Sequence, residues 1–216
     1  DGHRAGHAGQ NVLLVHDVVA GDESDALVHP PAAHGRVHAH VQTHAGSGAA
    51  VFDKPPRPAG RLAVQRMLRV QRHRGPDGEG LLAPEAIFSS DEAGQQERQS
   101  FFACPSSKVV FGHRRLAIID RSEAGQQPMS NEDGTVWITY NGEIYNYLEI
   151  KKDLERRGHR FRSQTDTEVI LHAYEEYGTN CLSYFNGMWA FALWDDREKL
   201  LFCARDRFGV KPFYYS

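Results

Sequence analysis

The sequence has few cysteines, no long apolar run and no excess of basic charge. Its three cysteines, Cys104, Cys181 and Cys203, are far apart and form no Cys-x-x-Cys pair. This argues against a disulfide framework or a cysteine zinc site and favours reduced thiols in the cytoplasm. No segment has the apolar length of a membrane-spanning helix or the pattern of a signal peptide. With a formal charge of -3, we expect neither a membrane nor a nucleic-acid partner.

The chain also lacks an initial Met, and its first 51 residues differ from the rest. They hold eight of the twelve histidines, many Ala and Gly, and one short apolar run at residues 11–19. Helical spacing would let some of these histidines share a metal ion. The candidates for that site are His34, His38, His40 and His44. A disordered tail and out-of-frame translation of a GC-rich gene start are the alternatives. We predict an atypical segment at 1–51 and a folded domain at 52–216.

The first part of the predicted domain has helix and strand signals separated by polar turns. Apolar spacing predicts a helix within residues 61–73. Residues 81–107 are polar and without a period, which predicts a surface insertion. Two apolar runs, 109–111 and 116–119, predict short strands that are separated by a cationic kink at 112–115.

The second part of the domain predicts two capped helices between strands. A strand that begins near residue 135 should end at an Asn141-Gly142 corner, and Asn146 should cap the next helix. Thr165 or Asp166 should cap a second helix. Apolar runs then predict a strand hairpin and a last strand at 213–215. Because helices and strands are segregated rather than alternating, we predict an α+β fold with layered sheets.

Six sequence blocks carry a family resemblance, because they occur in one order. They read RHRGPDGEG, GHRRLAIID, NGEIYN, TDTEVIL, GMWAFALWD and ARDRFGVKPFYY. Over about residues 52–216 they resemble the glutaminase domain of glutamine-hydrolysing asparagine synthetases, which are class II amidotransferases. The resemblance implies an N-terminal-nucleophile hydrolase fold with four layers, αββα. The His-Arg and Asn-Gly blocks favour this branch over relatives that make glucosamine phosphate or phosphoribosylamine.

The resemblance also implies a glutamine site. Hydrolysis of an amide passes through an oxyanion, which needs hydrogen-bond donors fixed in advance. By resemblance these donors are the Asn141 side chain and the Gly142 N–H. Arg115 would bind the substrate carboxylate and Asp166 its ammonium, with Glu143 beside the same pocket. The alternatives are a simple turn at Asn141-Gly142, a surface salt bridge for Arg115 and a helix cap for Asp166.

The nucleophile of the family has no counterpart in this chain. Family members begin Met-Cys-Gly-Ile, and after Met removal the cysteine thiol attacks while its own amine acts as the base. Here the aligned strand places Gly46, or after a one-residue slip Ser47, at that position. Three explanations stay open: a wrong gene start or frame, a propeptide cleaved to expose Ser47, and a non-catalytic relative that binds glutamine or a partner. We therefore expect the chain as given to be inactive.

The resemblance implies partners for this domain as well. It needs glutamine but no metal and no cofactor, and it does not need His73, His113, His159 or His172 as a general base. Ammonia would travel to a synthetase domain beyond Ser216, which would use ATP and Mg²⁺ to amidate aspartate. An acceptor other than aspartate and a homodimer are alternatives that the sequence leaves open. We expect a cytoplasmic protein.

Overall fold

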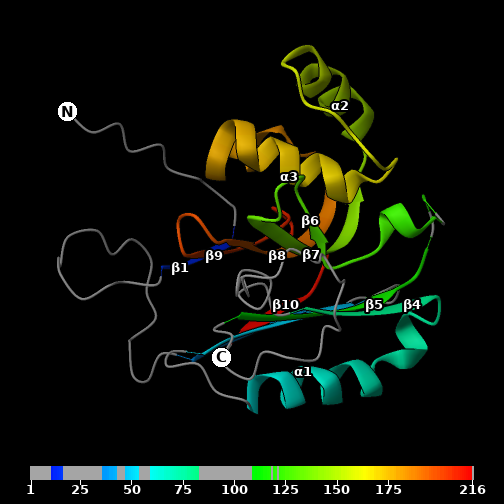
Figure 1. The fold of residues 1–216 in the computed structure, drawn as a ribbon, viewed down its shortest axis with the longest axis vertical. Helices are drawn as coiled ribbons and strands as arrows, with labels where there is room; N and C mark the ends of the chain where they lie inside the picture. The colour runs from blue at the N-terminus through cyan, green and yellow to red at the C-terminus, as the bar shows by residue number, and fades with distance from the viewer. Residues whose placement is uncertain are drawn as a thin grey trace, which may run out of the picture.

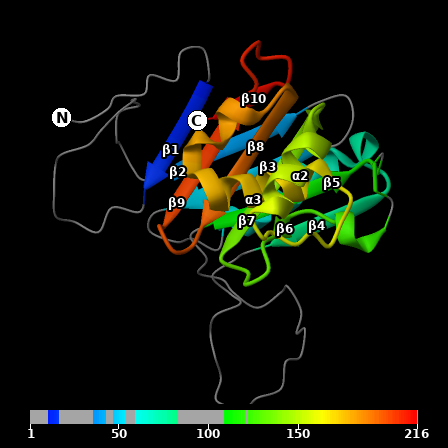
Figure 2. The same ribbon diagram turned by 90° about the horizontal axis from the view of Figure 1, so that it is seen from above.

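The chain folds into four layers, in which two antiparallel sheets pack face to face between helices (Figure 1). The computed structural model describes residues 11–16, 36–42, 47–53, 59–82, 109–117, 119–120 and 122–215. Helices α2 and α3 cover the outer face of one sheet, and α1 covers the outer face of the other (Figures 1 and 2). This arrangement confirms the predicted α+β fold with αββα layers.

Each sheet has five strands in the described part of the chain. The sheet under α2 and α3, called the upper sheet, has the order β1 (Asn11–His16), β9 (Leu200–Arg205), β8 (Gly187–Asp195), β7 (Val136–Ile144) and β6 (Met129–Ser130). The sheet over α1, called the lower sheet, has the order β10 (Phe213–Tyr215), β2 (Arg36–Gln42), β3 (Ser47–Asp53), β5 (Val109–Arg115) and β4 (Gly78–Leu82).

Among the described residues, three hydrophobic clusters hold the layers together. The largest joins α3 to the upper sheet and contains Ile170, Phe191 and Phe202. A second fills the space between the sheets, with Phe111 from the lower sheet and Trp194 from the upper one. The third joins α1 to the lower sheet. Side chains along a strand alternate between the two faces of its sheet. Each sheet can therefore contribute to two clusters, one with its helices and one with the other sheet.

The helices follow their sequence signals, with one exception. Helix α1 (Ala59–Val70) buries Val64 and Leu68, although Leu62 of the predicted stripe is exposed. Helix α3 (Asp166–Tyr177) is capped by Thr165, whose side chain accepts a hydrogen bond from the Glu168 N–H. Helix α2 (Tyr147–Arg156) has Asn146 at its cap position, but no side-chain capping bond forms there.

Short 3₁₀ helices complete the described chain, and a nearby loop explains the exception at Asn146. The 3₁₀ segments are Arg72–Arg74, Glu123–Gly125 and Gly178–Tyr184. The Asn146 amide donates to the Tyr184 carbonyl at 2.9 Å, and its oxygen accepts from the Asn186 N–H at 3.0 Å. The side chain thus holds the chain before β8 instead of capping α2. The capping-box prediction at Asn146 was wrong for this reason.

Two predicted strand breaks are absent. Strand β5 runs without interruption through residues 112–115, so the expected cationic kink is part of the strand. Strand β7 continues through Asn141 and Gly142 to Ile144, so these two residues lie within a strand and not at a corner. In both cases ladder pairing to neighbouring strands outweighs the local turn signal.

Three strands of the segment 1–51 belong to the sheets. Strand β1 pairs with β9, and β2 pairs with both β10 and β3. The predicted boundary at residue 52 falls inside β3. His38 and His40 lie in strand β2 and not in a helix, while His34 and His44 lie outside the described residues. The predicted insertion at 81–107 begins inside β4, and its residues 83–107 also lie outside them.

No helix in the described part of the chain is long and apolar enough to cross a membrane.

Candidate functional site

The Gly142 N–H points away from β8, toward the edge of β7 that faces α3. Tyr140 N donates to Gln127 Oε1 at 2.7 Å, and Ile144 N donates to Asp166 Oδ2 at 3.0 Å. Because N–H directions alternate along a strand, the N–H of Gly142 shares this edge. Trp189 lies opposite Gly142 on β8, and its hydrogen bonds support this direction of the Gly142 N–H. The Trp189 N–H donates to the Asp206 carboxylate, and the Trp189 carbonyl accepts from the Asp206 N–H, so neither bonds to Gly142.

Gly142 is also a packing requirement. A Cβ at this position would lie 2.4 Å from the Met188 carbonyl oxygen and 2.6 Å from Trp189 Cα. Directly opposite residues of a pair that is not hydrogen-bonded approach most closely in an antiparallel sheet. The neighbouring strand therefore excludes a side chain here, whatever the space that a ligand needs.

The Asn141 side chain belongs to the face of β7 that looks toward the lower sheet. Two residues earlier, Thr139 Oγ1 lies 3.1 Å from His113 Nδ1 on β5, so this face and that of β5 meet. Asn141 is buried. On the lower sheet, His113 pairs with Gly48 and Arg114 pairs with Ser47. The first residues of β3 thus pair with the part of β5 that contacts β7 two residues before Asn141.

Asp166 is a buried carboxylate tied to the same strand. Its Oδ2 accepts hydrogen bonds from the Tyr140 hydroxyl at 2.6 Å and from the Ile144 N–H at 3.0 Å. Only 4 % of the residue is exposed. Burial raises the pKa of Asp166, while these hydrogen bonds act in the opposite direction. Among the residues that the structure describes, no basic side chain forms an ion pair with it.

The Arg115 guanidinium is held by a loop that also contacts α3. Its Nη1 donates to the Ser122 carbonyl at 2.9 Å, and its Nη2 donates to the Asp120 carbonyl. Gly125 is the reason that the loop can approach, because a Cβ there would lie 2.5 Å from Nη2 and 3.1 Å from Thr165 Cγ2. The guanidinium of Arg115 and the Thr165 side chain at the start of α3 therefore lie on either side of Gly125.

Glu143 lies near the end of β7 and is exposed. Its charge contributes to raising the pKa of Asp166, and it opposes the lowering of the Lys211 pKa that burial causes. Glu143 is therefore close enough to Asp166 and Lys211 to influence the pKa of each.

The structure describes the start of β3, which is where the resemblance places the nucleophile, and the residue described there is Ser47 and not a cysteine. Ser47 is the first residue of β3, and Gly46 lies outside the described residues. Cys181 and Cys203 are fully buried, and burial raises the pKa of both thiols. Neither has the exposed, low-pKa thiol of a reactive cysteine. Cys104 also lies outside the described part.

Two residues that hold the site were not anticipated from the sequence. Tyr140 donates to Asp166, and Gln127 bridges the β7 backbone to the Thr167 hydroxyl on α3 at 3.3 Å. The signal for Tyr140 is its position next to Asn141 in an apolar strand, because a buried tyrosine hydroxyl needs a partner. Gln127 gives no such signal, since its loop has no period.

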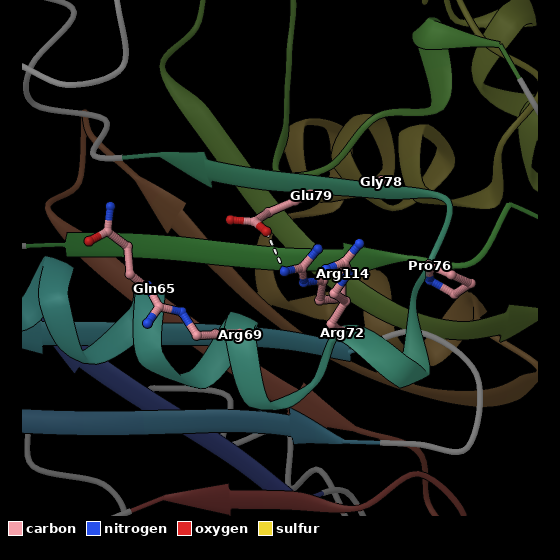
Figure 3. A pocket seen from close by; sticks show the side chains of 7 residues that line it. All are labelled: Gln65, Arg69, Arg72, Pro76, Gly78, Glu79 and Arg114. Atoms are coloured by element: carbon pink, nitrogen blue, oxygen red, sulfur yellow. Dashed lines mark ion pairs between the residues drawn. The ribbon is translucent and has the colours of Figure 1, made fainter.

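A hollow on the other face of β5 contains different residues (Figure 3). Arg114 points toward α1, donating to the Leu68 carbonyl at 2.8 Å and pairing with Glu79. The hollow is lined by Gln65, Arg69, Arg72, Pro76, Gly78, Glu79 and Arg114. Since neighbouring residues of a strand face opposite sides, Arg114 and Arg115 serve separate surfaces.

Comparison with known protein families identifies the class of protein to which this chain belongs. Residues 91–216 match the glutamine amidotransferase domain family. This match covers more than half of the chain, and the chain therefore belongs to that family.

Several curated relatives of this chain are named glutamine-hydrolysing asparagine synthetases. Asparagine synthetase 3 of Bacillus subtilis is 51 % identical over 110 residues, which are 50 % of this chain and 18 % of the relative. Asparagine synthetase 1 of the same organism is 40 % identical over 153 residues, 71 % of this chain and 21 % of the relative. The Zea mays enzyme is 40 % identical over 156 residues, 72 % of this chain and 22 % of the relative.

The chain thus spans about a fifth of the length of these relatives. Among solved structures, the glutamine phosphoribosylpyrophosphate amidotransferase of B. subtilis has a TM-score of 0.49 and 18 % identity. That match covers 78 % of this chain and 41 % of the other. The family assignment does not depend on it.

Proposed function

We propose that this chain is the glutaminase part of an asparagine synthetase and that it binds glutamine at the end of β7. The observation that carries the proposal is Asp166, a buried carboxylate without a basic partner among the described residues, next to the strand segment 141–143. A buried charge of this kind is costly until a cation joins it. The ammonium of an amino acid is a fitting cation.

In this proposal each end of glutamine has its own group. Asp166 pairs with the ammonium and Arg115 with the α-carboxylate, which a guanidinium can bind with two parallel hydrogen bonds. The side-chain carbonyl would then accept from the Asn141 amide and from the Gly142 N–H, whose direction leaves it outside the β8 ladder. Each such donor contributes about 3 kcal/mol to stabilising an oxyanion. Glu143 lies beside the same pocket.

Hydrolysis requires a nucleophile with a free amine, and this sequence has no such cysteine. For the chain as it stands we propose glutamine binding without ammonia release. Exposure of Ser47 by cleavage would supply a hydroxyl nucleophile instead. The non-catalytic alternative, a glutamine-binding or scaffold relative, uses the same Asp166 and Arg115 contacts.

For the whole protein we propose ammonia transfer to a synthetase domain that uses ATP and Mg²⁺ to amidate aspartate. The names of the relatives support this, since they are asparagine synthetases. Another acceptor and a homodimer remain alternatives. The proposal places the protein in the cytoplasm and involves neither nucleic acid nor a membrane.

Thermal unfolding with added ligand tests the binding proposal. Glutamine should raise the melting temperature with dose, because it binds only the folded chain, and asparagine and ATP should not. Asp166→Asn should lose most of this shift, since an amide still accepts from Tyr140 and Ile144 but carries no charge. Asp133→Asn, in an exposed turn, is the matched control and should keep the shift. Equal shifts in both variants would contradict the assignment of Asp166.

A further inference from the structure

Two histidines and a glutamate converge where the link between α2 and α3 meets α3. His159, in the link between α2 and α3, has its Nδ1 3.1 Å from the Nδ1 of His172 on α3. The Oε2 of Glu175 lies 3.1 Å from the same His172 nitrogen. One ligand atom from each of these three residues lies within 4.8 Å of the other two. The glutamine site does not use any of them.

The other nitrogen of each histidine faces a carboxylate. His159 Nε2 lies 3.3 Å from Glu176 Oε2, and His172 Nε2 lies 3.5 Å from Glu132 Oε1. Glu168 Oε1 is 3.8 Å from the same His172 atom. For His159, the carboxylate at Nε2 favours the tautomer with a proton there, which leaves the Nδ1 lone pair for a metal. Histidine ligands of metals are held in this way. His172 faces carboxylates at both of its nitrogens, with Glu175 Oε2 at 3.1 Å from Nδ1.

The two Nδ1 atoms, 3.1 Å apart, can share either a proton or a metal ion. For Zn²⁺ bound at about 2.0–2.1 Å in tetrahedral geometry, two nitrogen ligands are about 3.3 Å apart. The observed separation needs only a small opening. Glu175 is also oriented, because its Oε1 accepts from the Asn131 amide at 2.7 Å and its Oε2 is left toward the histidines.

The surrounding charge favours a dication over a single proton. Four carboxylates surround the pair, from Glu132, Glu168, Glu175 and Glu176. Against them stands Arg157, which binds Glu176 Oε1 at 3.1 Å. A divalent ion would balance more of this negative charge than a shared proton can.

We propose that His159 Nδ1, His172 Nδ1 and Glu175 Oε2 form a Zn²⁺ site that fastens the α2–α3 link to α3. Imidazole and carboxylate are suitable zinc ligands, and three protein ligands leave the fourth position for water. The site departs from the expectation that this domain needs no metal. The site lies apart from the proposed glutamine contacts, because Asp166 lies six residues before His172, about 9 Å along the helix.

Zinc titration of the metal-free full chain tests the proposal. The histidines before residue 45 can also bind zinc, so the variants must separate the sites. His159→Gln removes a ligand whose side chain is 17 % exposed, which the fold should tolerate. His73→Gln removes an exposed histidine elsewhere and is the matched control. In His159→Gln, but not in His73→Gln, we expect calorimetry to show that one zinc ion fewer binds than in the wild type. Alternatively, one zinc ion should bind at least a hundredfold more weakly.

Two further measurements make the test specific to this geometry. Zinc should raise the melting temperature of the wild type and of His73→Gln, but not of His159→Gln. Glu176→Gln, which changes the partner of His159 Nε2 and also removes the charge that pairs with Arg157, should weaken the same site about 10- to 100-fold. If folded His159→Gln binds zinc with the stoichiometry, affinity and thermal shift of the wild type, the proposal is overturned. Binding that needs millimolar zinc would overturn it as well.

Discussion

At the scale of single residues, Gly142 meets two separate requirements. Its N–H has to point to the open edge of β7, and its missing side chain lets β8 approach. The second requirement depends on the fold alone, because the clash would be with Met188 and Trp189 and not with a ligand. A turn-based interpretation of Asn-Gly could not foresee this, since it needs the register of β7 with β8.

Gly142→Ala should therefore lower stability even without any ligand. A Cβ 2.4 Å from a backbone oxygen forces two paired strands apart, and overpacking of this kind costs about 1–3 kcal/mol. Urea unfolding should show this loss in the free energy of unfolding. Gly78→Ala is the matched control on strand β4, because its Cβ would meet its nearest atoms at 3.5 Å. A Gly142→Ala chain as stable as this control would refute the packing argument.

At the scale of elements, His113 ties β5 to β7 and so joins the two sheets. Its Nδ1 lies 3.1 Å from Thr139 Oγ1, and Thr139 in turn donates to the Gly112 carbonyl at 3.4 Å. Burial first, and the neighbouring Arg115 charge second, lower the pKa of His113 to about 3. The imidazole therefore stays neutral in the folded chain at any ordinary pH.

This depressed pKa predicts a loss of stability on the acid side. The unfolded chain takes up a proton at His113 near the ordinary histidine pKa of 6.5, but the folded chain, with its lowered pKa, does so only near 3. Stability is therefore complete above pH 6.5 and falls toward pH 3, by up to about 1.4 kcal/mol per pH unit. Between pH 7.5 and 5.0 the wild type should lose about 2 kcal/mol more than His113→Asn.

Urea unfolding at the two pH values gives this difference directly. His73→Asn is the control, because His73 is exposed and its removal should leave the acid-side loss unchanged. His113→Asn will be less stable than the wild type at pH 7.5, since the imidazole packing is lost. Only the change with pH is diagnostic. Equal acid-side losses in His113→Asn and the wild type would mean that His113 is not held neutral.

The elements also show where sequence patterns suffice. Thr165 caps α3 as its pattern predicts, because Thr and the Glu168 N–H are three residues apart on one chain. Asn146 has the same local pattern, but its side chain bonds instead to residues near 185. A local rule cannot include a competing partner forty residues away in the sequence. The cationic residues of β5 illustrate this too, since only the layers show that Arg114 and Arg115 face opposite sides.

At the scale of the whole molecule, the four layers bring distant segments together. Segregated helix and strand patterns predicted the α+β class, and the ordered family blocks predicted the αββα layers. The series of contacts that connects β3 to His113, Thr139 and Asn141 could not be predicted, because it passes from one sheet to the other. Strands β1 and β2 were also missed, although β1 lies in the short apolar run 11–19 and residues 36–42 alternate between polar and apolar. Both signals lie in a His- and Ala-rich segment whose composition differs from the rest, and for that reason the segment was interpreted as atypical.

This arrangement predicts that a new chain start at β3 would create a glutaminase. The first residue of β3 pairs with Arg114, next to Arg115 of the proposed glutamine contacts, so only a thiol and a free amine are missing. Ser47→Cys, with a protease site directly before it, can be cut after folding, so that β1 and β2 stay in place. A second chain with Gly46→Cys tests the other alignment. We expect the cut form of one chain to release ammonia from glutamine at least about a hundredfold faster than its uncut form, which has the thiol but no amine. If both cut chains stay folded and remain as slow as the uncut ones, β3 does not begin at the reaction centre.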